Sequence, residues 1–287
     1  MPIRTVAILS KPRPHEVRAA LTGLLAWLHQ HGLATVIDLE TAKSLDTDGT
    51  CIARESLPDV DLVIVVGGDG TLLSATRALA GRDTPVLAVN LGSLGFLTPI
   101  ALDQMYPMLE RVLAGNYEED RRFILQSSVI RQGAVIETYH TLNDVVINKA
   151  AIARILDFHV SASGQAISKY KADGLIFSTP TGSTGYSLAA GGPIIDPHVD
   201  ALLLTPICSH TLNHRPLVLP GDSQLEVVID SFGEQVHLTA DGQVGMPIEH
   251  GDRVVCRRSP RVLRLIRPQS TGYFEILRNK LSWGQRS

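Results

Sequence analysis

Hydrophobic residues follow one pattern in the first part of this 287-residue chain and another in the rest. In the first part, short apolar runs alternate with segments whose apolar residues recur every three or four positions, as on one face of a helix. The runs predict strands at 5–9, 34–39, 62–66 and 85–90, and the periodic segments predict helices at 17–28, 72–80 and 102–114. This alternation predicts an α/β domain with a parallel, Rossmann-like sheet.

The pattern changes near Arg121, after which short strands separated by turn residues predominate. Strands are predicted at 125–131, 134–139, 145–148, 156–161, 225–230, 235–240, 252–258 and 262–266, and a closing helix at 273–281. At about 150 residues per domain, this length favours two domains. We therefore expect an α/β domain over 1–121 and a β-rich domain over 122–265.

Composition excludes several classes of protein. With 44% hydrophobic and 19% charged residues the chain can bury a core, and its net charge of −3 argues against nucleic acid as a partner. No apolar run approaches the roughly 18 residues of a membrane helix, and the first run is too short for a signal peptide. Cys51, Cys208 and Cys256 lie far apart, which predicts reduced thiols in a cytoplasmic protein, at buried or half-buried positions.

The first chemical motif is Gly67-Gly68-Asp69-Gly70-Thr71, between a predicted buried strand and a helix. Glycines and a helix start favour phosphate. A carboxylate repels phosphate, so Asp69 indicates metal binding or removal of a proton from an attacking hydroxyl, whereas a simple Asp-Gly turn is the structural alternative. The Gly-x-x-x-x-Gly-Lys-Ser/Thr loop is absent, and Leu73 stands where a dinucleotide fingerprint has its third glycine.

Four further segments carry polar groups suited to a nucleotide. Residues 90–97 form a glycine-containing loop after the strand at 85–90, which would line one crevice with the first motif; a tight turn is the structural alternative. Asn143-Asp144 suits a ribose diol or an adenine edge, with a turn or strand-entry pair as the alternative. Residues 171–193 combine hydroxyls and glycines, with Tyr186 able to stack on a base, and 241–243 read as a hairpin turn. Six arginines within 253–267 indicate a solvated sheet edge, with a phosphate-binding patch as the alternative. No histidine spacing indicates a metal site, so metal ligands stay unassigned.

The chain resembles the bacterial NAD kinases. The resemblance rests on motifs in the family's order at 67–71, 90–97, 143–144, 173–193, 204–212, 215–217 and 241–243. The resemblance implies transfer of phosphate from ATP to the 2′-hydroxyl of the adenosine ribose of NAD, giving NADP and ADP, with a divalent metal ion (Mg²⁺ or Mn²⁺). It implies a dimer or tetramer that binds small nucleotides, and a C-terminal segment, 266–287, that returns to the first domain.

The resemblance also implies roles for individual residues. Asp69 is expected to be the general base or to orient the hydroxyl, while Gly67, Gly68, Gly70 and Thr71 meet the phosphates. Residues expected at the NAD site are Asn143, Asp144, Arg154, Lys171, Asp173, Thr184, Gly185, Tyr186, Ser187, Leu188, Ala189 and Gln243. Of these, Lys171 and Asp173 are expected at the nicotinamide side or at a neighbouring subunit's ligand. Two departures occur: the family usually has Glu at Asp144 and Ala at Gly185.

Two other functions stay open. One is a lipid or sugar kinase of the same glycine-aspartate superfamily, and the other is a non-catalytic sensor that binds NAD(P). The phosphoryl donor (ATP or polyphosphate), the use of NADH and feedback by NADPH are open as well.

Overall fold

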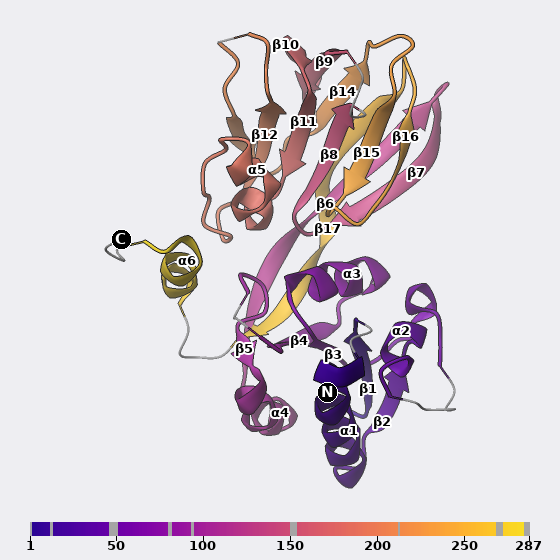
Figure 1. Cartoon of the computed structure of the whole chain (residues 1–287), viewed down its shortest axis with the longest axis vertical. Helices are drawn as coiled ribbons and strands as arrows, with labels where there is room; N and C mark the ends of the chain where they lie inside the picture. The colour runs from indigo at the N-terminus through magenta and orange to yellow at the C-terminus, as the bar shows by residue number, and fades with distance from the viewer. Residues whose placement is uncertain are drawn as a thin grey trace. The chain divides into compact units, whose positions relative to one another are not determined.

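The computed structural model describes residues 2–11, 14–45, 51–79, 82–92, 95–149, 154–211, 213–267 and 272–283, with backbone only at 14–16. It divides into two compact units (Figure 1). Unit 1 comprises residues 1–121 and 263–287, and unit 2 comprises residues 122–262. Among the described residues, no helix combines the length and apolar character that crossing a bilayer requires.

Unit 1 contains the predicted parallel sheet. Its strands are β1 (Thr5–Ser10), β2 (Ala34–Ile37), β3 (Leu62–Val66), β4 (Pro85–Asn90) and β5 (Ile100–Ala101), and they pair in the order β2-β1-β3-β4 with β5 parallel to β4. The end of β17 (Arg253–Arg267) pairs parallel to β4 through Arg264 and Leu265. The order of parallel strands places the ends of β3 and β4 side by side at one sheet edge.

Helices cover both faces of this sheet. The apolar side chains of α1 (Pro14–Gln30) and α4 (Met105–Leu113) share one core with alternate residues of β1, β3 and β4. Helix α3 (Asp69–Leu79) contacts β1 and β3, whose remaining residues are equally buried. Burial on both faces explains why residues 62–66 form an uninterrupted apolar run. Shorter helices are α2 (Leu39–Ala42), η1 (Arg54–Ser56) and η2 (Leu102–Gln104), and α6 (Tyr273–Leu281) closes the chain.

Unit 2 consists of antiparallel strands in two sheets. One sheet has the order β13-β12-β11-β8-β15-β16, and strands of the other include β10-β9-β14-β17, with β6 paired to β17 and β7. Apolar residues from both sheets form one core, in which Phe158 and Phe177 are the largest fully buried side chains. The α/β and β-rich fold class predicted from the sequence is therefore confirmed. The bounds are β6 (Glu118–Arg131), β7 (Ala134–Thr141), β8 (Asp144–Lys149), β9 (Leu156–Ala162), β10 (Gln165–Ala172), β11 (Gly174–Ser178), η3 (Thr181–Thr184), α5 (Tyr186–Ala189), β12 (Ala201–Ile207), β13 (Leu217–Pro220), β14 (Leu225–Ile229), β15 (Val236–Ala240) and β16 (Val244–Ile248).

Several local expectations were wrong. The strand predicted at 34–39 ends at Ile37, because the Asp38 carboxylate caps α2 by accepting the N–H of Thr41 at 2.9 Å. The two strands predicted within 252–266 are one continuous strand, β17. β17 has partners on both sides, so its arginines do not mark a sheet edge. Arg253, Arg258, Arg264 and Arg267 pair with carboxylates instead, namely Glu226, Asp200, Glu119 and Asp120.

Candidate functional site

The glycine-aspartate motif lies where β3 meets α3. The peptide N–H of Gly67 donates to the carbonyl of Val89 at 2.9 Å, which joins the ends of β3 and β4. A Cβ on Gly67 would lie 2.4 Å from the Thr71 hydroxyl oxygen, so this tight strand-to-helix turn admits only glycine. Helix α3 begins at Asp69 rather than at residue 72 as predicted, so the motif itself forms the first helical turn.

The carboxylate of Asp69 is held by the loop that follows β4. Its Oδ2 accepts the N–H of Phe96 at 2.9 Å, and its Oδ1 accepts the N–H of Leu97 at 3.1 Å and the hydroxyl of Thr98 at 2.9 Å. A carboxylate offers about four acceptor positions. Three are filled by the protein, so one position on Oδ2 is left for a further donor.

A second layer of hydrogen bonds holds that loop. The side-chain amide N–H of Asn90 donates to the Thr98 hydroxyl at 2.6 Å, and the side-chain oxygen Oδ1 of Asn90 accepts the N–H of Gly92 at 2.7 Å. A Cβ on Gly95 would lie 1.9 Å from the Asp69 Oδ1, so the loop closes on the carboxylate only because residue 95 is glycine. Residues 90–97 were interpreted as a second loop of the same crevice, and the contacts to Asp69 support that placement. Ser93 and Leu94 of that motif lie outside the described residues.

These two loops line a cavity of about 350 Å³ in unit 1. That volume is at the lower end of the roughly 300–1,000 Å³ typical of small-molecule sites. The predicted phosphate-loop residues Gly67, Gly68, Gly70 and Thr71 all line it, as do Asp69 and the cations Lys11 and Lys280. Among the described residues of this lining, Asp69 is the single carboxylate, so the cavity suits an anionic group beside one acceptor.

In unit 2, Asn143 and Asp144 lie at the start of β8, against the hydroxyl-rich loop. The Thr179 hydroxyl donates to the Leu142 carbonyl at 2.6 Å, and the Thr179 N–H donates to the Asn143 carbonyl at 2.9 Å. A Cβ on Gly182 would lie 2.2 Å from that same Asn143 oxygen, so glycine is required for the approach. Side-chain atoms of Asn143 and Asp144 lie close to Gly185. The structure thus brings the 143–144 pair and the loop together.

Asp241 completes this cluster. Its carboxylate accepts the N–H groups of Leu142, Asn143 and Asp144 at 3.2, 2.8 and 3.3 Å, and its own N–H donates to the Asp144 carbonyl at 2.9 Å. Asp241 has a φ of +51°, a turn conformation, and it is buried. The hairpin turn predicted at 241–243 therefore also positions the residues proposed to bind adenosine.

The environment of Asp144 favours its neutral form. Burial, with the nearby Asp241 carboxylate, raises the pKa of the Asp144 carboxyl to about 7. A carboxyl group with a pKa near neutrality exchanges its proton under physiological conditions, and such shifts concentrate at binding and catalytic sites.

The remaining candidates of the 184–189 segment differ in exposure. Thr184 ends η3, and Tyr186, which begins α5, is 43% exposed and available for stacking on a ligand. The Ser187 hydroxyl is instead buried and shares a 2.8 Å hydrogen bond with the Thr205 hydroxyl. Ser187 therefore anchors the loop to β12. Leu188 is half-buried, Ala189 is exposed, and the exposed Gln243 follows the turn at Asp241.

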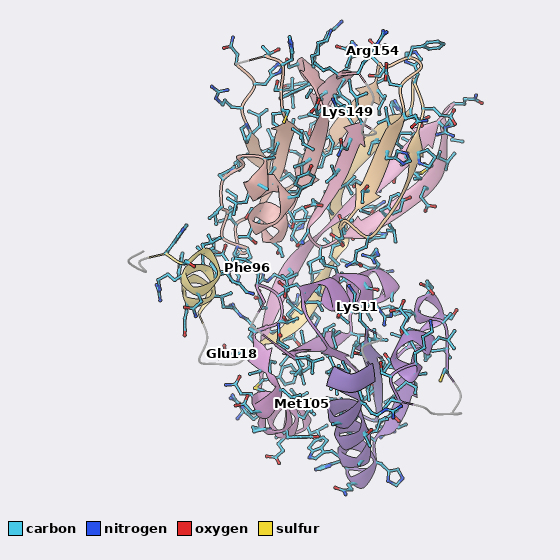
Figure 2. All side chains as sticks on the ribbon, viewed as in Figure 1. Lys11, Phe96, Met105, Glu118, Lys149 and Arg154 are labelled. Atoms are coloured by element: carbon cyan, nitrogen blue, oxygen red, sulfur yellow. The ribbon has the colours of Figure 1, made fainter. Side chains whose placement is uncertain are left out.

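Lys171, Asp173 and Arg154 do not join the Asp144 cluster. In the register of β8 with β11, Ser178 faces Asp144 and Gly174 faces Asn148, so Asp173 lies beyond the opposite end of the strand pair, about 17 Å from Asp144 along the strands. Asp173 pairs there with Lys149 at 2.7 Å, Lys171 lies 3.8 Å from the Asp157 carboxylate, and the Arg154 N–H donates to Glu234. Figure 2 shows Lys149 and Arg154 at one end of unit 2.

The cysteines and the possible metal-ligating side chains were also candidates for a site. The three cysteines are free: Cys256 is buried, which raises its pKa to about 12, and Cys51 is half-buried, but Cys208 is exposed, contrary to expectation. Across the described ranges, no three His, Cys, Asp or Glu side chains come together as metal ligands.

Four residues of these sites were not predicted from the sequence. Thr98 holds Asp69, Asp241 holds the 142–144 backbone, and Lys11 and Lys280 line the phosphate cavity. Thr98 directly follows the predicted loop and Asp241 sits in an Asp-Gly pair, so both had a local signal. Lys11, which follows β1, had none.

Comparison with known proteins points to one family. Residues 6–117 match the model of the ATP-NAD kinase N-terminal domain, and residues 142–268 match that of the ATP-NAD kinase C-terminal domain. NAD kinases of Geotalea daltonii and Koribacter versatilis are each 48% identical over 285 residues, covering 99% of this chain and all of the relative.

Solved structures agree with the sequence comparison. Yeast NADH kinase complexed with NADH aligns with a TM-score of 0.91 and 25% identity, over 100% of this chain and 89% of that one. An NAD kinase from Archaeoglobus fulgidus in complex with ATP aligns with a TM-score of 0.76 and 22% identity, over 97% of this chain and 98% of that one.

Proposed function

Because this chain belongs to the ATP-NAD kinase family, we propose that Asp69 is the residue around which it phosphorylates NAD. The activity is transfer of the terminal phosphate of ATP to the 2′-hydroxyl of the adenosine ribose of NAD, giving NADP and ADP. The observation that supports the role of Asp69 is the single acceptor position left on its carboxylate at the wall of the glycine-lined cavity. The 2′-hydroxyl is the donor that would fill that position.

The chain's own residues then divide the work. Asp69 orients the hydroxyl and takes its proton as the bond to phosphorus forms. Gly67, Gly68, Gly70 and Thr71 let the phosphates approach the backbone at the start of α3, where the helix dipole favours negative charge. We propose that unit 1 is the phosphate-binding domain and that unit 2 is the NAD-binding domain.

Within unit 2, we assign the adenosine portion of NAD to the cluster around Asn143 and Asp144. An ionised Asp144 accepts hydrogen bonds from the ribose, the Asn143 amide can read the adenine edge, and Tyr186 stacks on the base. Gly185 borders this cluster. Asp173, Lys171 and Arg154, at the other end of the strand pair, suit a nicotinamide group or a neighbouring subunit's ligand.

A divalent ion fits the cavity only as part of the donor. Mg²⁺ is commonly held by one or two carboxylates together with water and phosphate oxygens, and Asp69 is the one carboxylate among the described residues that line the cavity. We therefore propose that Mg²⁺ or Mn²⁺ arrives on the triphosphate, where it neutralises phosphate charge. We also propose that the protein is cytoplasmic. We propose that it forms a dimer or tetramer, and size-exclusion chromatography with light scattering tests this oligomeric state.

The decisive experiment compares Asp69→Asn with Asp59→Asn, an exposed carboxylate of the same unit. With NAD, ATP and magnesium, Asp69→Asn should lower kcat by about 10³-fold or more while the protein stays folded at the assay temperature, and the control keeps its activity. Full activity of Asp69→Asn would reject its assignment. NAD binding without NADP formation by the unmodified protein would instead favour a non-catalytic sensor.

A further inference from the structure

The phosphate cavity of unit 1 has no cation within its own motif. The segment Gly67–Thr71 contains no lysine or arginine, whereas the common phosphate-binding loop carries a lysine that reaches the terminal phosphates. A nucleoside triphosphate carries several negative charges, and Asp69 adds one more at the cavity wall. Any cationic side chain that meets the phosphates must therefore come from elsewhere in the chain.

Two lysines line the cavity from distant parts of the sequence. Lys11 directly follows β1, and Lys280 lies in the last turn of α6. Both side chains are exposed, and among the described residues neither ammonium group forms an ion pair with a carboxylate. Asp69, the one carboxylate in the described part of the lining, accepts hydrogen bonds from three donors that are not lysines. The two charges are therefore available to a ligand.

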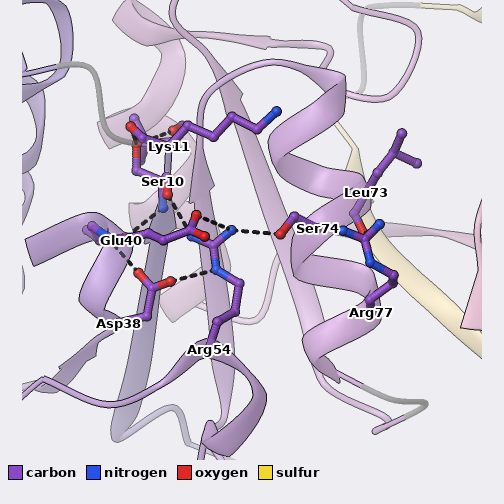
Figure 3. A network of polar contacts seen from close by, with 10 residues as sticks. Ser10, Lys11, Asp38, Glu40, Arg54, Leu73, Ser74 and Arg77 are labelled. Carbon is purple, nitrogen blue, oxygen red and sulfur yellow. Dashed lines mark hydrogen bonds and ion pairs between the residues drawn. The ribbon is translucent and has the colours of Figure 1, made fainter. Parts of the chain in front are cut away.

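The backbone before Lys11 is fixed on several sides. The Ser10 N–H donates to the Thr41 hydroxyl at 2.7 Å, and the Ser10 hydroxyl donates to the Val66 carbonyl at 2.8 Å. Figure 3 shows the Lys11 side chain extended towards α3, the helix that begins with Asp69. The backbone from which the Lys11 side chain extends is therefore held in place next to the glycine loop.

A buried ion pair also holds the backbone at Ser10, next to Lys11. Arg54 donates to the Ser10 carbonyl at 2.6 Å and to the Ser74 hydroxyl of α3 at 2.9 Å, and its charge is balanced by Asp38 at 2.5 Å (Figure 3). Both Arg54 and Asp38 are nearly inaccessible to water. Because Asp38 neutralises the charge of Arg54, we assign this arginine to linking β1 and α3. We assign phosphate binding to Lys11 instead.

We propose that Lys11 and Lys280 together bind the phosphates of the donor, supplying the positive charge that the glycine loop lacks. The inference rests on the proposed function, since it concerns the cavity assigned to the phosphoryl donor. The two residues act on the triphosphate group itself, because the cavity they share is the one lined by the glycine loop.

The test uses inorganic tripolyphosphate, which has the phosphate groups of the donor but no base or ribose. Its dissociation constant is measured by calorimetry with magnesium for the full-length protein, Lys11→Met, Lys280→Met and the control Lys43→Met. Lys43 is exposed on unit 1 at the end of α2 and does not line the cavity. We expect each cavity variant to bind about tenfold more weakly, the effect of one charge-assisted hydrogen bond, and the control to bind normally.

Kinetics give an independent readout. Both variants should raise KM for ATP about tenfold and leave KM for NAD unchanged, whereas a general structural defect would move both constants. Unaltered tripolyphosphate binding by either variant would overturn the proposal. Because the calorimetry uses no NAD, lysine-dependent binding in a protein that forms no NADP would reject the proposed function alone.

Discussion

Thr98 offers a direct way to weaken the hold on Asp69 without touching that residue. Its hydroxyl donates to the Asp69 carboxylate and accepts the Asn90 amide, and its side chain is fully buried. Thr98→Val keeps the shape of the side chain but removes the hydroxyl. The variant therefore isolates the hydrogen bonds from the packing.

The expected size follows from the two bonds lost. A hydrogen bond to a charged group contributes about 1.5–3 kcal/mol, and a buried amide without an acceptor costs about 1–3 kcal/mol. We expect the free energy of unfolding to fall by about 3 kcal/mol. If about half of that reflects the lost positioning of Asp69, kcat falls about tenfold, since each 1.36 kcal/mol of barrier is a factor of ten.

Urea unfolding and a coupled NADP-forming assay measure both quantities. The matched control is Thr98→Ser, which keeps the hydroxyl and loses one methyl group, and its kcat should stay within about twofold of the unmodified enzyme. Wild-type kcat in Thr98→Val would refute the reasoning, because Asp69 would then keep its position without this hydroxyl.

Three further changes test other parts of the structure. Gly95→Ala places a Cβ 1.9 Å from the Asp69 carboxylate and should lower kcat about 100-fold in the same assay, since a shift near 1 Å has that effect; normal kcat would contradict so close an approach of the loop to Asp69. Gly182→Ala, with its Cβ 2.2 Å from the Asn143 carbonyl oxygen, should lower the free energy of unfolding by about 1–3 kcal/mol, as measured in urea. An unchanged free energy of unfolding would show that the loop can shift freely. NAD affinity should rise between pH 6 and 8 as Asp144 ionises, whereas calorimetry on Asp144→Asn should show no such rise.

The same carboxyl group affects stability with the opposite sign. Its pKa is about 7 in the folded protein and 3.8 in the reference state, so folding favours the protonated form. The stabilisation from protonation is fully present below about pH 4 and is lost as the pH rises towards 7. Asp144→Asn should therefore gain stability relative to the unmodified protein at pH 8 more than at pH 4, which urea unfolding at the two pH values measures.

Periodicity predicted the elements of unit 1 because each strand is short, apolar and followed by an amphipathic helix. Residues 62–66 and 85–90 match β3 and β4 at both ends. The pattern could not show that Asp38 leaves the strand to cap α2, since that choice depends on a side-chain hydrogen bond. Nor could it show that β17 continues through 259–261, which depends on pairing with distant strands.

The sites divide in the same way. The glycine loop around Asp69 was predictable because the residues that form it, 67–71, are consecutive in the sequence. The donors to Asp69 and the acceptor Asp241 were not, because they act on residues 27–29 and 97–99 positions away in the chain. Which of the candidate residues lie together likewise depends on strand register, which separates Asp173 from Asp144.

The order in which the chain is made bears on how unit 1 can fold. Its sheet includes β17, whose residues Arg264 and Leu265 pair with β4, some 180 positions earlier in the sequence. During synthesis the whole of residues 122–262 must emerge before that pairing can form. The enclosed β-rich unit can therefore complete its fold first, while the unit that contains the N-terminus is completed last.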